Sequence, residues 1–81
     1  MTRILVTINL KNGVHDPQAE AVHHALQDMG FGNVTSMTMG KQMVLDINED
    51  DHDKAIKQAE EMCRQLLANT VLERFEAQVL L

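Results

Sequence analysis

Four histidines and twelve acidic residues are the side chains of this 81-residue sequence with the chemistry to bind a metal ion. Glu20, His24 and Asp28 follow one another at intervals of four, which places them on one face of a helix. Carboxylate and imidazole groups at this spacing could ligate a divalent metal, or could form ion pairs on a solvated helix face; we favour the second interpretation. His15 precedes Asp16-Pro17 and could meet a ligand or only occupy a loop.

A second group of acidic side chains resembles the opening of a calcium-binding loop. Asp46, Asn48 and Asp50 have the spacing of the first EF-hand ligands. However, Asp51 stands where that loop requires glycine, and Lys57 stands where a glutamate closes the site. We therefore interpret the acidic residues before the second predicted helix as charges and caps at its N-terminus.

The single cysteine, Cys63, lies among the apolar residues of a predicted helix, where burial raises the pKa of a thiol and lowers its reactivity. One cysteine cannot form an internal disulfide. The sequence has no Ser-His-Asp or Cys-His arrangement and no phosphate-binding loop, since Gly30-Phe31-Gly32 lacks a third glycine. We predict no catalytic, cofactor-binding or metal-binding residue in this chain.

Two polar segments are better candidates for contacts with another protein. Lys11, Asn12, Gly13 and Asp16 belong to a loop between a predicted strand and a capped helix, and such loops often carry binding residues. Gly40-Lys41 has the composition of a two-residue hairpin turn that exposes an ammonium group, although such a turn can also serve solubility alone. We predict that these six residues contact a partner.

Hydrophobic periodicity predicts the elements that position these residues. Alternating apolar residues predict strands at 4–10 and 74–81, and a hairpin of two strands at 33–39 and 42–47. Spacings of three and four predict helices at 17–29, between Asp16-Pro17 and Gly30, and from Asp50 or Asp51 to Asn69. The predicted order is βαββαβ.

This order predicts an α+β, ferredoxin-like fold, with a four-stranded antiparallel sheet and two helices on one face, in a single domain over residues 1–81. The other sheet face is then uncovered, and a chain of this length buries only about 60% of its unfolded surface. We therefore expect a homodimer or higher homo-oligomer. The residues expected in the dimer contact are Phe75, Val79, Leu80 and Leu81.

Charge and composition exclude several classes of partner. Seven basic against twelve acidic residues give a net charge of -5, which is the wrong sign for binding a nucleic-acid backbone. Two phenylalanines, without tyrosine or tryptophan, give no platform for stacking bases. No run of 18 apolar residues and no signal-peptide pattern occurs. We expect a cytoplasmic protein with no nucleic-acid or membrane partner.

Several segments together resemble a known family over nearly the whole chain. They are the strand leading into Leu10-Lys11, Asp16-Pro17-Gln18, Ala25-Leu26, Gly40-Lys41 and above all Cys63 to Glu73, which reads CRQLLANTVLE. In these residues the chain is similar to the PurS subunit of phosphoribosylformylglycinamidine synthase. Ala19 and Thr38 depart from the family pattern, which often has glycine and arginine at those two places.

The resemblance implies a small non-catalytic subunit of purine biosynthesis that forms a PurS-like dimer and bridges the glutaminase subunit PurQ and the synthetase subunit PurL. It implies that ammonia from glutamine passes to PurL, which uses ATP and magnesium to convert formylglycinamide ribonucleotide to formylglycinamidine ribonucleotide, while this chain binds no cofactor. The alternative is a ferredoxin-like regulatory module that senses a small ligand or a metal, which only the histidines and the acidic loop support.

Overall fold

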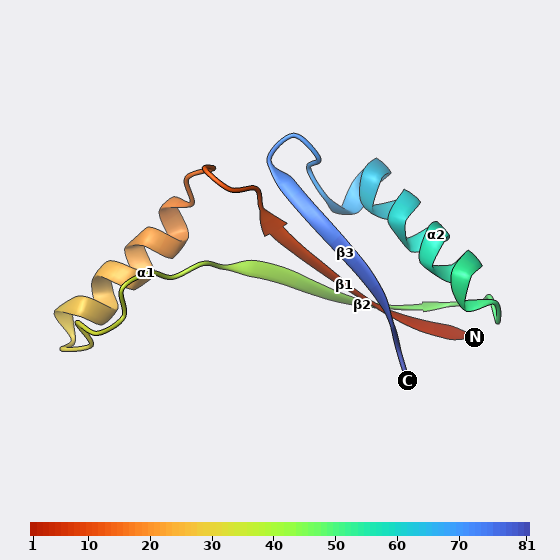
Figure 1. The fold of residues 1–81 in the computed structure, drawn as a ribbon, viewed down its shortest axis with the longest axis horizontal. Helices are drawn as coiled ribbons and strands as arrows, with labels where there is room; N and C mark the ends of the chain where they lie inside the picture. The colour runs from red at the N-terminus through yellow and green to blue at the C-terminus, as the bar shows by residue number, and fades with distance from the viewer.

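The computed structural model describes residues 1–81 and contains three strands and two α-helices. Along the chain these are β1 (Thr2–Leu10), α1 (Pro17–Asp28), β2 (Gly40–Ile47), α2 (His52–Met62), a π-helical turn η1 (Cys63–Leu67) and β3 (Glu73–Leu80). The strands form one antiparallel sheet in the order β2-β1-β3, and α2 packs on one face of it (Figure 1). The predicted α+β class is confirmed.

The core lies between the central strand β1 and helix α2. Alternate side chains of β1 are buried against a row of small side chains on α2 and at the first residue of η1, which lets the helix approach the sheet closely. The six residues of these two rows have 0–1% of their surface exposed: Ile4, Val6, Ile8, Ala55, Ala59 and Cys63. Apolar side chains of β2 and β3 cover the sides of this core. The period of two predicted for the first and last strands is confirmed.

The fourth predicted strand, at residues 33–39, is absent, and the sheet has three strands. These residues instead form an extended segment that returns from the end of α1 to the start of β2 (Figure 1). Because α1 lies beyond the end of the sheet, the chain uses this segment, at about 3.3 Å per residue, to cross the distance. The segment therefore cannot lie alongside β2, and the order is βαβαβ.

Gly40-Lys41 is not a hairpin turn, because these residues open β2. Gly40 pairs with Asn9, and Lys41 pairs with Ile8. A Cβ atom added at Gly40 would overlap the Asn9 side chain and lie 2.8 Å from the carbonyl oxygen of Ile8. Glycine is needed here because the two strands come close together, whereas the sequence suggested a turn with positive φ.

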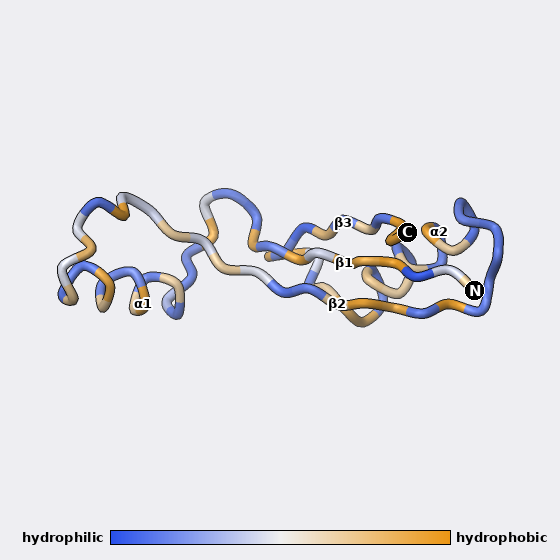
Figure 2. The backbone as a smooth tube through the Cα atoms, turned by 90° about the horizontal axis from the view of Figure 1, so that it is seen from below, coloured by the Kyte–Doolittle hydropathy of each residue, from blue (hydrophilic) through white to orange (hydrophobic).

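Helix α1 forms as predicted but does not pack on the sheet. Asp16 caps its N-terminus, Pro17 occupies its first turn, and Gly30, at a φ of 99°, follows its C-terminus. The helix lies apart from the sheet and from α2 in both views (Figures 1 and 2). Val22 and Met29 of its apolar stripe are consequently 41% and 72% exposed. The prediction of two helices on one sheet face is wrong, because only α2 covers the sheet.

The molecule is elongated, with extents of 49 × 27 × 14 Å and a radius of gyration of 16.1 Å. A compact chain of this length has a radius of gyration of about 12 Å. Apolar side chains that a compact fold would bury remain exposed on α1 and on the open sheet face, where Val44 is 57% exposed. This shape leaves apolar surface for another polypeptide to cover.

Gly40→Ala is expected to lower the free energy of unfolding by about 1–3 kcal/mol, because the added methyl group forces β2 away from the Ile8 carbonyl. Gly32→Ala is the matched control: Gly32 has no positive φ, and an added Cβ meets no atom within 4 Å. The control should be neutral or raise the free energy of unfolding by less than about 1 kcal/mol. Urea unfolding followed by circular dichroism measures both, and equal losses in the two variants would contradict the prediction.

Candidate functional site

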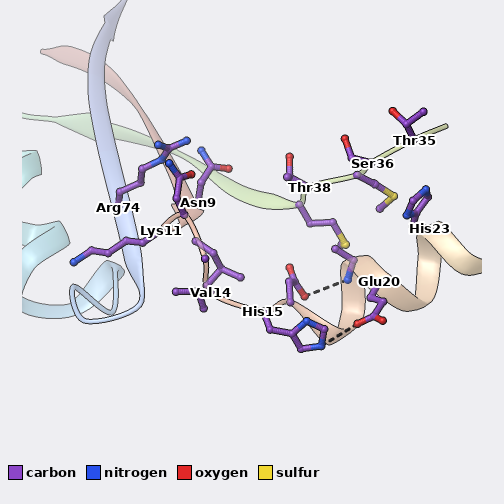
Figure 3. Close-up of a pocket in the computed structure, with 17 residues that line it drawn as sticks. Asn9, Lys11, Val14, His15, Glu20, His23, Thr35, Ser36, Thr38 and Arg74 are labelled. Atoms are coloured by element: carbon purple, nitrogen blue, oxygen red, sulfur yellow. Dashed lines mark hydrogen bonds and ion pairs between the residues drawn. The ribbon is translucent and has the colours of Figure 1, made fainter.

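A cleft of about 580 Å³ opens where the end of β1 meets α1 and the returning segment (Figure 3). Its walls come from the loop after β1, the first half of α1 and residues 35–39, and Arg74 of β3 lies at one end. Only five of its 17 lining residues are hydrophobic, whereas pockets for small molecules are mainly apolar. Four of the six residues predicted to contact a partner line this cleft: Lys11, Asn12, Gly13 and Asp16.

The loop after β1 is held by its own backbone. The Lys11 N–H donates to the Leu72 carbonyl at 2.8 Å, and the Val14 N–H donates to the Lys11 carbonyl at 3.1 Å. Gly13 adopts a φ of 84° within this turn, a conformation that favours glycine. The Lys11 ammonium forms no ion pair and is free to meet a partner.

Asp16 lies in the cleft but has a structural task. One of its carboxylate oxygens accepts hydrogen bonds from the backbone N–H groups of Gln18 and Ala19, at 3.0 and 3.1 Å. These bonds satisfy two of the N–H groups that the first turn of a helix leaves without partners. The carboxylate of Asp16 therefore fixes the start of α1 and, with it, one wall of the cleft.

Gly40 and Lys41 lie outside the residues that line the cleft. The Lys41 Nζ is 3.5 Å from the Glu73 Oε2, and the Glu73 side chain is only 15% exposed. The other Glu73 oxygen accepts the Asn69 N–H at 2.8 Å. Lys41 thus connects β2 to β3 across the central strand, and less of its charge is free for a partner than at Lys11.

The residues that suggested a metal site have other partners. The His15 Nε2 lies 2.9 Å from the Glu20 Oε2, and the His24 Nε2 lies 3.7 Å from the Asp28 Oδ2. The i, i+4 contact favoured from the spacing is therefore present between His24 and Asp28, on an exposed helix face. No group of three or more histidine, cysteine, aspartate or glutamate side chains lies close enough together to hold a metal ion.

His23 fastens the returning segment to α1. Its Nε2 lies 2.6 Å from the carbonyl oxygen of Val34, so this ring nitrogen donates a hydrogen bond to it. The cleft also contains the hydroxyl groups of Thr35, Ser36 and Thr38. No hydrogen bond joins these hydroxyls to an imidazole, so this arrangement has no nucleophile in contact with a base.

The acidic residues from the end of β2 to the start of α2 have partners within the fold. Asp46 accepts a hydrogen bond from the Arg3 Nε–H at 2.9 Å, which lowers the pKa of Asp46. Asp50 pairs with the N-terminal ammonium group, and the hydrogen bond to it lowers the pKa of Asp50. Asp51 caps α2 by accepting two backbone N–H groups, at 3.0 and 3.2 Å. The helix cap predicted for this segment is confirmed at Asp51.

Cys63 is fully buried at the junction of α2 and the π-helical turn. Burial is the main cause that raises the pKa of its thiol, and the neighbouring Glu60 carboxylate adds to the effect. The predicted place of Cys63 in the core is confirmed.

The four residues predicted in a dimer contact fall into two pairs. Phe75 and Val79 pack against the core beneath α2, and the Arg64 guanidinium lies 5.7 Å from the centre of the Phe75 ring. Leu80 and Leu81 are exposed at the end of β3. Phe75 and Val79 are partly buried, so Leu80 and Leu81 expose more surface than they do, and the dimer contact stays a prediction for all four residues.

Several cleft residues were missed from the sequence. The sequence predicts a strand at 33–39, and this prediction gives no sign that residues 35–39 line the cleft. Arg74 reaches the cleft because the β1–β3 register pairs it with Asn9. The polar character of both positions is visible in the sequence, but their pairing depends on a register that links the two ends of the chain.

Asp16→Ala is expected to lower the free energy of unfolding by about 1 kcal/mol, because two N–H groups at the start of α1 lose their acceptor. Asp16→Ser keeps a capping oxygen without the charge and should stay near the wild type. Thermal unfolding followed by circular dichroism compares the two variants. An equal loss in both would show that the negative charge, and not the cap hydrogen bond, is what matters.

Comparison with known proteins places these features in one family. A family model described as PurS, phosphoribosylformylglycinamidine (FGAM) synthase, matches residues 3–80. Phosphoribosylformylglycinamidine synthase subunit PurS of Bacillus subtilis (strain 168) is 42% identical over 79 residues, which cover 98% of this chain and 93% of that protein.

Solved structures share the whole fold. The crystal structure of Methanocaldococcus jannaschii PurS, one of the subunits of formylglycinamide ribonucleotide amidotransferase in the purine biosynthetic pathway, has a TM-score of 0.90 at 35% identity and covers 99% of this chain and 96% of that chain. A chain in the structure of PurLQS from Thermotoga maritima has a TM-score of 0.88 at 24% identity, with 98% and 96% covered. At that identity the second likeness concerns the fold.

Proposed function

The chain belongs to the PurS family of phosphoribosylformylglycinamidine synthase subunits, and from this premise we propose that it is a non-catalytic subunit that bridges the glutaminase PurQ and the synthetase PurL. In this role it supports the transfer of ammonia from PurQ to PurL in the cytoplasm. PurL uses ATP and magnesium to convert formylglycinamide ribonucleotide to formylglycinamidine ribonucleotide. The chain itself binds no cofactor in this scheme.

The elongated fold is the observation that best supports a bridging role. The molecule is 49 Å long, and its sheet has one face without a covering helix. Apolar side chains stand exposed at α1, on the open sheet face and at the corner between α2 and β3. A subunit that contacts several other chains at once needs separate exposed surfaces of this kind.

Within the predicted partner interface, our proposal rests mainly on the loop after β1. Lys11 and Asn12 are exposed, and neither side chain is committed to a bond within the chain. Asp16 and Lys41 have structural partners and contribute mainly by holding the loop and the sheet in place. A free charge such as that of Lys11 speeds the encounter with an oppositely charged surface more than it tightens the complex.

We place a second copy of the chain against the exposed apolar surface of the first. The exposed residues are on α1, at Val22 and Met29, and at the end of β3, at Leu80 and Leu81. Covering them would restore the burial that a compact domain of this length achieves within one chain. Phe75 and Val79 support this contact from beneath, because they fix β3 on the core.

The proposed function predicts that purified PurQ and PurL form formylglycinamidine ribonucleotide from glutamine only when this chain is present. With an ammonium salt as the nitrogen source, PurL should need the chain much less, because free ammonia does not have to pass between subunits. The measurement is product formation with each nitrogen source, with and without the chain. Equal dependence on the chain with both sources would contradict a role in coupling the two sites.

The proposed dimer predicts a mass of at least twice 9.1 kDa by light scattering. Replacing Leu80 and Leu81 together by glutamine should weaken self-association by about tenfold or more, because the variant removes apolar surface from the contact. Val71→Gln is the matched control, since Val71 is 78% exposed but precedes the other end of β3. A monomeric wild type, or a control that dissociates as readily, would contradict this contact.

A further inference from the structure

Large apolar side chains are exposed in the segment that joins α2 to β3, which we call the Leu66–Leu72 corner. Leu66 is 84% exposed, Val71 is 78% exposed and Leu72 is 44% exposed. Water penalises such apolar surface unless another molecule covers it. The residues named for the proposed dimer contact, Val22, Met29, Leu80 and Leu81, do not include this corner, and Leu80 and Leu81 lie at the opposite end of β3.

The backbone of the corner is held by several hydrogen bonds, although its apolar side chains are exposed. Asn69 is the centre of the hydrogen bonding: its side-chain oxygen accepts the Val71 N–H at 3.1 Å, and its carbonyl accepts the N–H groups of Leu72 and Glu73 at 3.0 and 2.7 Å. The Glu73 carboxylate in turn accepts the Asn69 N–H at 2.8 Å. The Leu72 carbonyl accepts the Lys11 N–H at 2.8 Å. A loop that is already ordered loses little conformational entropy when a partner binds it.

Two unpaired cations flank the corner in a chain whose net charge is -5. Lys11 is tied to Leu72 through its backbone, and Arg74 follows Leu72 by two residues. Neither side chain forms an ion pair within the chain. Figure 3 shows both side chains beside the start of β3. The apolar corner is therefore bordered by positive charge.

This charge argues against a second copy as the occupant. In a two-fold contact centred on this corner, Lys11 and Arg74 of one copy would approach the same cations of the other. Like charges brought together across an interface oppose binding. The occupant that fits is a different protein, with an apolar depression bordered by carboxylates.

We propose that the Leu66–Leu72 corner is the apolar anchor through which this chain binds a larger subunit of the synthase, with Lys11 and Arg74 at the rim. This inference rests on the proposed function and adds to it the chemistry of the contact. Protein interfaces draw most of their binding energy from a few well-packed side chains surrounded by a polar rim. The corner has that composition, with Val71 and Leu72 at its centre and the two cations around them.

The test measures binding of the full-length chain to purified PurL and PurQ, each alone and both together, by biolayer interferometry. Leu66→Gln combined with Val71→Gln should weaken binding about 10- to 100-fold, mainly through faster dissociation. Lys11→Glu should instead slow association and reduce its dependence on salt. Phe31→Gln is the matched control, because Phe31 is 50% exposed in the loop after α1 and belongs neither to the corner nor to the proposed dimer contact, so this variant should bind as the wild type does.

A second variant tests the hydrogen bonding of the backbone. Asn69→Ala removes the side-chain oxygen that accepts the Val71 N–H but leaves every apolar residue in place, so it should weaken binding by less than the double variant. Light scattering and urea unfolding on each variant confirm that the dimer and the fold persist. Binding of the double variant at wild-type strength would overturn this inference while the proposed function stands.

Two other outcomes separate the proposals further. If the double variant becomes monomeric, the corner is a contact between copies of this chain, and the inference is overturned. If the wild type binds neither larger subunit, alone or together, the proposed function itself fails.

Discussion

Close contact between α2 and the central strand is the packing on which the rest of the molecule depends. Ala55, Ala59 and Cys63 present small side chains to β1, so the helix axis comes close enough to bury the three branched side chains beneath it. β2 and β3 then pair with the two edges of the same strand. With both edges of β1 occupied and one face covered by α2, neither the sheet nor the core cluster includes a residue of α1.

The position of α1 follows from this packing of the sheet and α2. The core leaves α1 without a place on the sheet, so the helix stands apart and the residues around it form the polar walls of the cleft. Its own stability comes from the Asp16 cap and from the His23 contact to the Val34 carbonyl, since packing contributes little. Because α1 exposes apolar surface, we expect this subunit to function in contact with other chains.

The sequence predicts local features well and long-range ones poorly. The cap at Asp16, the left-handed Gly30, the burial of Cys63 and the alternation along β1 depend on neighbours in sequence, and each is found in the structure. The prediction of a fourth strand, at 33–39, was wrong because a strand needs a neighbouring strand with which to pair. The position of α1 decides whether such a neighbour is within reach. Gly40 shows the same limit. The glycine indicates a special backbone site, but only the pairing with Asn9 shows that glycine is needed because β1 and β2 come close together there. The cleft residue Arg74 was missed for the same reason, because its place depends on pairing between the first and last strands.

The charged groups at the two ends of the sheet are used differently, and this difference supports the place that we propose for the partner surface. At the end that holds the N-terminus, Arg3 pairs with Asp46, and the terminal ammonium pairs with Asp50, so charges there satisfy one another within the chain. At the other end, the Lys11 N–H joins the loop after β1 to the Leu72 carbonyl, while the Lys11 side chain stays free. That hydrogen bond joins the loop that lines the polar cleft directly to the apolar corner. In our proposal, a partner that binds one of them therefore also lies next to the other.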